Sequence, residues 1–201
     1  MNNEKKLILK FPKYLKENVM GNTELLQYKE EFLDKESLKH FMLVGDFCCG
    51  ADNPLNTFLS DDAFDYSEEK QGHTYILMDN EKTCILAFYT IKANAIHTFD
   101  VYTNEYMALP VVEIARIAVD FDFQGNGLGK VLFYDYIIPK IKEVSKIIAI
   151  YGIIVFVESD NEQGIRFYNS LGFKKANDET QKAVGDSYNE KCELYVLELT
   201  D

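Results

Sequence analysis

The sequence lacks the cysteine and histidine spacings that hold structural metal ions. No two of its four cysteines form a C-x-x-C pair, and its three histidines, His40, His73 and His97, lie far apart along the chain. Structural zinc sites depend on such closely spaced pairs. We therefore expect no metal site, and we interpret the cysteines as the reduced thiols of a cytoplasmic protein.

Long apolar runs are also missing. Near the N-terminus an apolar run of only three residues, 7–9, precedes Lys10, which is too short for the apolar part of a secretory signal. The longest apolar stretch, residues 147–157, contains Gly152 and falls short of the roughly 18 residues that a membrane span needs. We therefore expect neither a signal peptide nor a membrane partner.

Basic residues are few. The chain has 21 lysines and arginines against 33 aspartates and glutamates, so its net charge is −12. Proteins that bind nucleic-acid phosphates normally carry a basic surface. The acidic net charge therefore argues against nucleic acid as the main partner, although charged tRNA is not excluded as a substrate. Hydrophobic residues make up 47% of the chain, enough to build a folded core.

The order of the hydrophobic patterns predicts a mixed α/β chain. Asn53 and Pro54 are typical of a helix start, Gly172 is typical of a helix end, and Pro139 is expected to bend or end its helix. We assign residues 1–37 to an N-terminal extension packed on a single domain of residues 38–201. We expect helices at 24–32, 35–41, 54–69, 128–141 and 162–171, strands at 41–46, 74–78, 84–91, 111–119, 150–157, 173–175 and 192–199, and an irregular segment at 93–109.

A glycine-rich turn lies between a predicted strand and a predicted helix and reads Gln124-Gly125-Asn126-Gly127-Leu128-Gly129-Lys130. Glycines let a backbone approach a ligand closely, and the free amides and dipole of a helix start favour an anion. A dinucleotide-binding loop would need a small residue where Lys130 stands, and a P-loop would need a hydroxyl residue where Val131 stands. The remaining pattern is Q-x-x-G-x-G, which the turn satisfies.

A second block, residues 161–173, reads Asn-Glu-Gln-Gly-Ile-Arg-Phe-Tyr-Asn-Ser-Leu-Gly-Phe. In this order the two blocks resemble the GCN5-related N-acetyltransferase (GNAT) superfamily over residues 38–199, with Gly164 in place of the family's alanine. The resemblance implies a mixed, mostly antiparallel sheet of six to seven strands, splayed between the fourth and fifth strands and flanked by helices. It also implies that acetyl-CoA donates an acetyl group to a primary amine by direct attack in a ternary complex.

A narrower resemblance involves residues 47–50, 55–59, 86–89 and 114–120, which are similar to the GNAT toxins of toxin–antitoxin pairs. Those toxins acetylate aminoacyl-tRNA, but Cys48 stands where they usually carry aspartate. Three functions therefore stay open: an enzyme for a small-molecule or peptide amine, a toxin acting on charged tRNA, and a non-catalytic acyl-CoA-binding module. The resemblance is compatible with a monomer or a homodimer.

The superfamily resemblance also assigns contacts with the coenzyme. The turn of residues 124–130 should bind the pyrophosphate, although Lys130 is alternatively just solvated. Asn161 should contact the coenzyme or cap the following helix, and Phe167 should contact the coenzyme or belong to the core. The strand backbone at Ile117, Ala118 and Val119 should contact the pantetheine arm.

Catalysis requires a neutral amine and a protonated leaving thiol. The resemblance places Tyr168 beside the coenzyme sulfur as the acid. Glu113 lies 11 residues before Gln124, the offset of a catalytic glutamate in histone-acetylating relatives, so it is the candidate base. A solvated strand-end carboxylate and a water relay remain the alternatives. The candidate contacts with the acceptor are Tyr89, Asn94 and His97.

Overall fold

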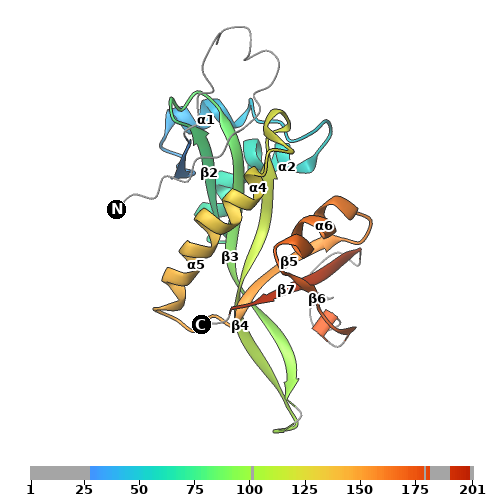
Figure 1. The fold of residues 1–201 in the computed structure, drawn as a ribbon. Helices are drawn as coiled ribbons and strands as arrows, with labels where there is room; N and C mark the ends of the chain where they lie inside the picture. The colour runs from blue at the N-terminus through green and yellow to red at the C-terminus, as the bar shows by residue number, and fades with distance from the viewer. Residues whose placement is uncertain (1–27, 101, 179, 182–190, 200–201) are drawn as a thin grey trace, which may run out of the picture. The chain divides into compact units, whose positions relative to one another are not determined.

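The computed structural model describes residues 28–100, 102–178, 180–181 and 191–199. Its contacts divide the chain into two units, Met1–Thr90 with Arg116–Tyr136 and Ile91–Ala115 with Ile137–Asp201. Seven strands are hydrogen-bonded in the order β1-β2-β3-β4-β5-β7-β6 (Figure 1). This mixed sheet with flanking helices confirms the predicted fold class.

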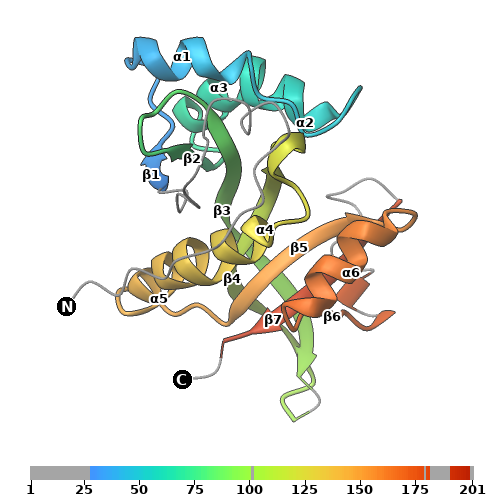
Figure 2. The ribbon, with the colours of Figure 1, turned by 45° about the horizontal axis from the view of Figure 1, so that its top comes forward.

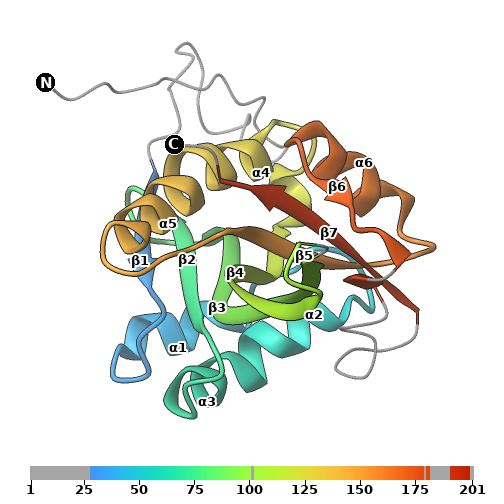
Figure 3. The same ribbon diagram turned by 90° about the horizontal axis from the view of Figure 1, so that it is seen from below.

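The first unit begins with a strand and a set of short helices. Asn53 caps α2, because its Oδ1 accepts a hydrogen bond from the Leu55 amide at 3.0 Å, and Pro54 occupies the first turn, as predicted. Figure 3 shows α1 and α3 on one side of β2 and β3, and α4 on the other. The elements that lie wholly or partly in this unit are β1 (Tyr28–Phe32), α1 (Leu38–Val44), α2 (Pro54–Thr57), the π-helical η1 (Phe58–Asp62), α3 (Ala63–Glu68), β2 (His73–Asp79), β3 (Ile85–Asp100), β4 (Glu105–Val119), the 3-10 turn η2 (Phe121–Phe123), α4 (Leu128–Val131) and the π-helical η3 (Leu132–Ile137).

Two predictions for the start of the chain are wrong. Residues 28–32, predicted as helix, form β1, which pairs antiparallel with β2 so that Phe32 lies opposite Tyr75. Residues 41–44, predicted as strand, continue α1, in which the buried His40 and Val44 lie four residues apart on one helix face. Residues 1–27, which include most of the predicted extension, lie outside the described residues.

The second unit contains the rest of β3 and β4. β4 pairs in parallel with β5 from Val111 with Gly152 to Glu113 with Ile154. The ladder ends at Glu113 although β4 continues, which corresponds to the predicted splay. Figure 2 shows α6 against β5 and β7. The remaining elements of this unit are α5 (Ile138–Ser145), β5 (Gly152–Glu158), α6 (Glu162–Ser170), β6 (Lys174–Lys175) and β7 (Cys192–Glu198).

The segment 93–109 is not irregular, so that prediction is also wrong. β3 extends to Asp100 and β4 starts at Glu105, and the two strands form a long hairpin that projects beyond β5 (Figure 1). Ile96 is buried, whereas residues 102–108 are exposed on both faces of the ribbon. The alternation of buried and exposed residues that reveals a strand in a sequence is therefore missing here.

The predicted helix ends are partly confirmed. Gly172 follows α6 in the left-handed conformation, with φ +96°, as expected for a residue just past a helix C-terminus. Pro139 does not end its helix, because α4, η3 and α5 follow one another directly and Pro139 lies in the first turn of α5. No described helix is long and apolar enough to cross a membrane.

Candidate active site

The glycine-rich turn connects the end of β4 with α4 in the first unit. Gly125 and Gly127 have φ values of +75° and +82°, and a Cβ atom at either position would meet no atom within 4 Å. Glycine is therefore needed for the backbone conformation and not to avoid a neighbour. The open space beside both residues leaves their backbone accessible to a ligand.

The start of α4 supplies hydrogen-bond donors. Gly127 is the N-cap residue and has no side chain to cap the helix. The amides of Leu128 and Gly129 lie in the first helical turn, where an amide has no partner within the helix. Amides at such positions can donate hydrogen bonds to an anion such as a phosphate group.

Side chains within the turn fix its conformation. The Gln124 Nε2 donates hydrogen bonds to the carbonyls of Cys49 and Val119, each at 2.9 Å. The Asn126 Nδ2 donates to the carbonyls of Phe123 and Gln124 at 3.2 and 3.0 Å. Both amides contact the protein's own backbone, so the turn is ordered by the chain itself.

The other first-unit residues assigned to the coenzyme lie on either side of the turn. On β4, Ala118 is buried in the core, and Ile117 and Val119 are half-buried. Lys130 is exposed in the first turns of α4. The contacts of Ile117, Ala118, Val119 and Lys130 with the coenzyme stay predictions.

Asn161 caps α6 in the second unit, as one of its two predicted roles requires. Its Oδ1 accepts a hydrogen bond from the Gly164 amide at 2.8 Å. A Cβ at Gly164 would lie 2.9 Å from the Asn161 Nδ2. An alanine at position 164 would therefore require a small shift of the Asn161 side chain.

Tyr168 lies on α6 and is buried. Its ring packs edge-on against Phe167 and Phe173, with ring centroids 5.2 and 5.5 Å apart. Burial raises the pKa of the Tyr168 phenol above its ordinary value, because the charged form loses its solvation. Tyr168 is thus protonated at neutral pH and can donate a hydrogen bond, while Phe167 is half-buried beside it.

Glu113 is almost completely buried, with 1% of its surface exposed. Its Oε2 accepts a hydrogen bond from the Asn94 Nδ2 at 2.6 Å and lies 3.2 Å from the Lys92 Nζ. A buried carboxylate requires such partners. The alternative of a solvated carboxylate at the end of a strand is therefore wrong for Glu113.

Lys92 is a partner of Glu113 that the sequence did not reveal. It lies two residues before Asn94 on β3, so both side chains are on one face of the strand. The sequence signal that could have revealed it is a lysine between two apolar residues, Ile91 and Ala93, at the end of a predicted strand. Its partner is 21 positions away in the sequence, and only the hairpin brings the two together.

The structure does not group the three candidate acceptor contacts. Tyr89 belongs to the first unit and is fully buried, stacks on Tyr75 and donates its hydroxyl to Glu30. Burial and this carboxylate raise the pKa of Tyr89. Asn94 and His97 belong to the second unit and lie on opposite faces of β3, with His97 exposed.

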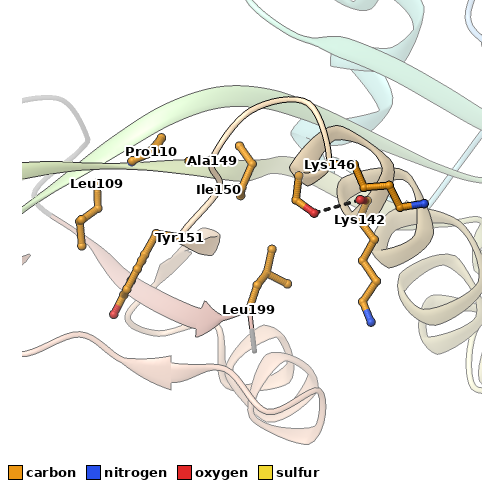
Figure 4. A pocket seen from close by; sticks show the side chains of 9 residues that line it. Leu109, Pro110, Lys142, Lys146, Ala149, Ile150, Tyr151 and Leu199 are labelled. Atoms are coloured by element: carbon orange, nitrogen blue, oxygen red, sulfur yellow. Dashed lines mark hydrogen bonds between the residues drawn. The ribbon is translucent and has the colours of Figure 1, made fainter. Parts of the chain in front are cut away.

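A cavity of about 570 Å³ lies in the second unit, between the start of β4 and the end of α5. Figure 4 shows its lining, including the hydrogen bond from the Ser145 hydroxyl to the Lys142 carbonyl at 2.9 Å. None of the residues predicted for the reaction lines this cavity, so we do not assign it to the reaction. Its lining residues are Leu109, Pro110, Lys142, Ser145, Lys146, Ala149, Ile150, Tyr151 and Leu199.

Comparison with protein families and curated proteins relates this chain to acetyltransferases. The model of the acetyltransferase (GNAT) family matches residues 47–173, which include the glycine-rich turn, Glu113 and α6. The mycothiol acetyltransferase of Saccharomonospora viridis is 28% identical over 111 residues. These are 55% of this chain but 33% of that protein, so the chain matches about a third of its relative's length.

Solved structures with the same fold include a toxin and its complexes. The crystal structure of AtaTR bound with acetyl-CoA is 26% identical, with a TM-score of 0.63 over 85% of this chain and 92% of that one. The structure of AtaT complexed with acetyl-methionyl-tRNAfMet is 23% identical, with a TM-score of 0.66 over 86% of this chain and 95% of that one. At this identity the second likeness supports the fold alone.

Proposed function

The chain belongs to the acetyltransferase (GNAT) family, and on that premise we propose that it transfers the acetyl group of acetyl-CoA to a primary amine by direct attack in a ternary complex. The observation that carries the proposal is the turn of residues 124–130. Its two left-handed glycines expose the backbone, and the amides at the start of α4 offer donors to the pyrophosphate. Lys130 would add a positive charge near the phosphates.

We assign the thiol side of the reaction to Tyr168. The departing thiolate has a pKa of about 8.5 by analogy with cysteine, and an ordinary phenol has a pKa of about 10. Because burial raises the pKa of Tyr168 further, complete proton transfer to the thiolate would be uphill. We therefore expect a hydrogen bond from the Tyr168 hydroxyl to stabilise the sulfur as the carbon–sulfur bond breaks.

We assign the amine side to Glu113, with a water relay to bulk solvent as the alternative. The acceptor reaches the enzyme mainly as an ammonium ion and must lose a proton before it attacks the thioester. Asn94 and Lys92 hold the Glu113 carboxylate. Asn94 and the exposed His97 remain candidates for acceptor contact, whereas the buried Tyr89 would reach an acceptor only after leaving Glu30.

The remaining coenzyme contacts are proposals of the same kind. The backbone of Ile117, Ala118 and Val119 would contact the pantetheine arm. The Asn161 side chain caps α6 through its Oδ1, so its Nδ2 would be the atom that contacts the coenzyme. Phe167 would pack against the coenzyme through its exposed part.

A second candidate function is that of a toxin acting on aminoacyl-tRNA. It is favoured by the likeness to AtaTR at 26% identity over 85% of the chain. The net charge of −12 speaks against it. This function predicts growth arrest on expression and rescue by a partner protein, so harmless overexpression would count against it.

The experiment that tests the proposed function is a thiol-release assay with acetyl-CoA. The acceptor panel contains polyamines, amino acids, peptides, aminoglycosides and aminoacyl-tRNA, and each reaction is repeated with the Tyr168→Phe variant. We expect thiol release above background with one acceptor class. Coenzyme binding without release from any acceptor would instead support a non-catalytic acyl-CoA-binding module.

A further inference from the structure

The segment of residues 48–50, between α1 and α2, is bonded to the chain that leads into the glycine-rich turn. The Cys48 amide donates to the Asp120 Oδ2 at 3.1 Å, and the Cys48 carbonyl accepts from the Phe121 amide at 2.7 Å. The Cys49 carbonyl accepts from the Gln124 Nε2 at 2.9 Å. Two consecutive residues of this segment therefore fix three residues at the entrance of the turn.

Asn56 on α2 in turn fixes the 48–50 segment. Its Oδ1 accepts from the Cys49 amide at 2.9 Å and from the Cys49 thiol at 3.2 Å. Its Nδ2 donates to the Gly50 carbonyl at 2.8 Å and lies 3.9 Å from the Cys48 sulfur. The amide side chain suits this position because it has an acceptor atom and a donor atom side by side.

We propose that Asn56 is a positioning residue for coenzyme binding, an inference that rests on the proposed function. Asn56 fixes the direction of the Cys49 carbonyl, and this carbonyl is one of the two acceptors that hold the Gln124 side chain. Without Asn56 the entrance of the turn can move. Coenzyme binding must then order this entrance, which costs conformational entropy and weakens the affinity. A site that is already ordered before binding avoids this cost.

Asn53, the N-cap residue of the same short helix, provides a matched control. Its side chain caps α2 by accepting from the Leu55 amide. It stabilises the helix start through Leu55, which lies outside the 48–50 segment. Substitutions of the two asparagines therefore distinguish the loss of the helix cap from the loss of contacts that hold the 48–50 segment.

The experiment compares Asn56→Ala with Asn53→Ala by thermal unfolding and by calorimetric titration with coenzyme A. Both variants should unfold at lower temperature than the wild type, because each loses side-chain hydrogen bonds. Asn56→Ala should weaken coenzyme A binding about tenfold, whereas Asn53→Ala should weaken it less than about twofold. With acetyl-CoA, the effect of Asn56→Ala should fall on KM and leave kcat at saturation within about twofold.

A second pair, Asn56→Asp and Asn53→Asp, tests the inference even if Asn56→Ala does not fold. Aspartate keeps the acceptor for the Cys49 amide, loses the donor to Gly50, and is an equally good cap at position 53. Asn56→Asp should weaken coenzyme A binding severalfold, and Asn53→Asp should bind like the wild type. The inference would be overturned if the Asn56 variant bound coenzyme A as tightly as the Asn53 variant in each pair. A wild-type protein that does not bind coenzyme A would instead overturn the proposed function.

Discussion

The glycine-rich turn of the first unit and Glu113 of the second are both held by polar contacts, but different groups are engaged. In the turn, Gln124 and Asn126 bond to backbone carbonyls, and no side chain of the N-cap residue engages the amides at the start of α4. At Glu113 the carboxylate itself is bonded to Asn94 and paired with Lys92. The two regions thus differ in which group is engaged: side-chain amides in the turn, and the carboxylate itself at Glu113.

The largest effect should follow from breaking the conformation of the turn. Valine at position 127 would be strained at φ +82° by about 1–2 kcal/mol and would also occupy the space of the ligand. Gly127→Val should therefore weaken coenzyme A binding about 100-fold in calorimetric titration. Gly45→Ala, at φ −70° with no atom within 4 Å, is the control and should bind normally. Normal binding by Gly127→Val would show that the turn is not the coenzyme site.

The next largest effect should separate chemistry from binding. Tyr168→Phe removes the hydroxyl but keeps the packing against Phe167 and Phe173. Turnover should fall at least about tenfold while acetyl-CoA affinity stays nearly unchanged. Tyr151→Phe, which removes a hydroxyl bonded to Glu198, is the control for the loss of a phenol elsewhere in the unit. Full turnover by Tyr168→Phe would exclude its role at the sulfur.

A smaller effect should tell whether Glu113 exchanges its partners during the reaction. Glu113→Gln keeps the shape of the side chain and removes the base, so kcat should fall severalfold and the acidic limb of the pH–rate profile should move. Unfolding temperatures of the variant must be recorded as well, because Lys92 loses its ionic partner. Glu105→Gln, at an exposed position on the same strand, is the control. An unmoved profile would favour the water relay.

The smallest effect concerns β1, where ion pairs of Glu31 add to the backbone pairing with β2, whereas neutral side-chain amides hold the turn. The hydrogen bond from Lys82, with contributions from His40 and Lys29, lowers the pKa of Glu31 from 4.5 to about 2. A lowered folded-state pKa means that this stabilisation is present above pH 4.5 and is lost as the pH falls toward 2.

Glu31→Gln should therefore lower the unfolding temperature at neutral pH and differ less from the wild type as the pH approaches 2. Unfolding followed by circular dichroism across this range measures the difference. Glu81→Gln, exposed in the neighbouring turn, should show no such convergence. A constant difference between Glu31→Gln and the wild type would contradict the charge-based account of β1.

The sequence predicted those elements that depend on local chemistry. Asn53 with Pro54 marked the start of α2, and Gly172 marked the end of α6, because caps and left-handed positions select particular residues. The glycine-rich turn was recognisable for the same reason. Its anchoring by Cys49 was not, because the two segments are 75 residues apart in the sequence.

The predictions failed where distant residues determine the structure. Residues 28–32 form a strand because β2 offers an edge to pair with, and residues 93–109 form a hairpin without a buried face along most of its length. The burial of Glu113 depends on Lys92 and Asn94 from the neighbouring strand. Single-strand patterns contain no information about such partners.

The most direct test of the account is a calorimetric titration of acetyl-CoA into the wild-type protein. We predict one binding site with a Kd between about 1 µM and 1 mM, the usual range for enzyme substrates. Addition of desulfo-coenzyme A, which keeps the pyrophosphate, should compete for the same site. A wild-type protein that binds neither compound at about 1 mM would contradict the assignment of residues 124–130 as the coenzyme site.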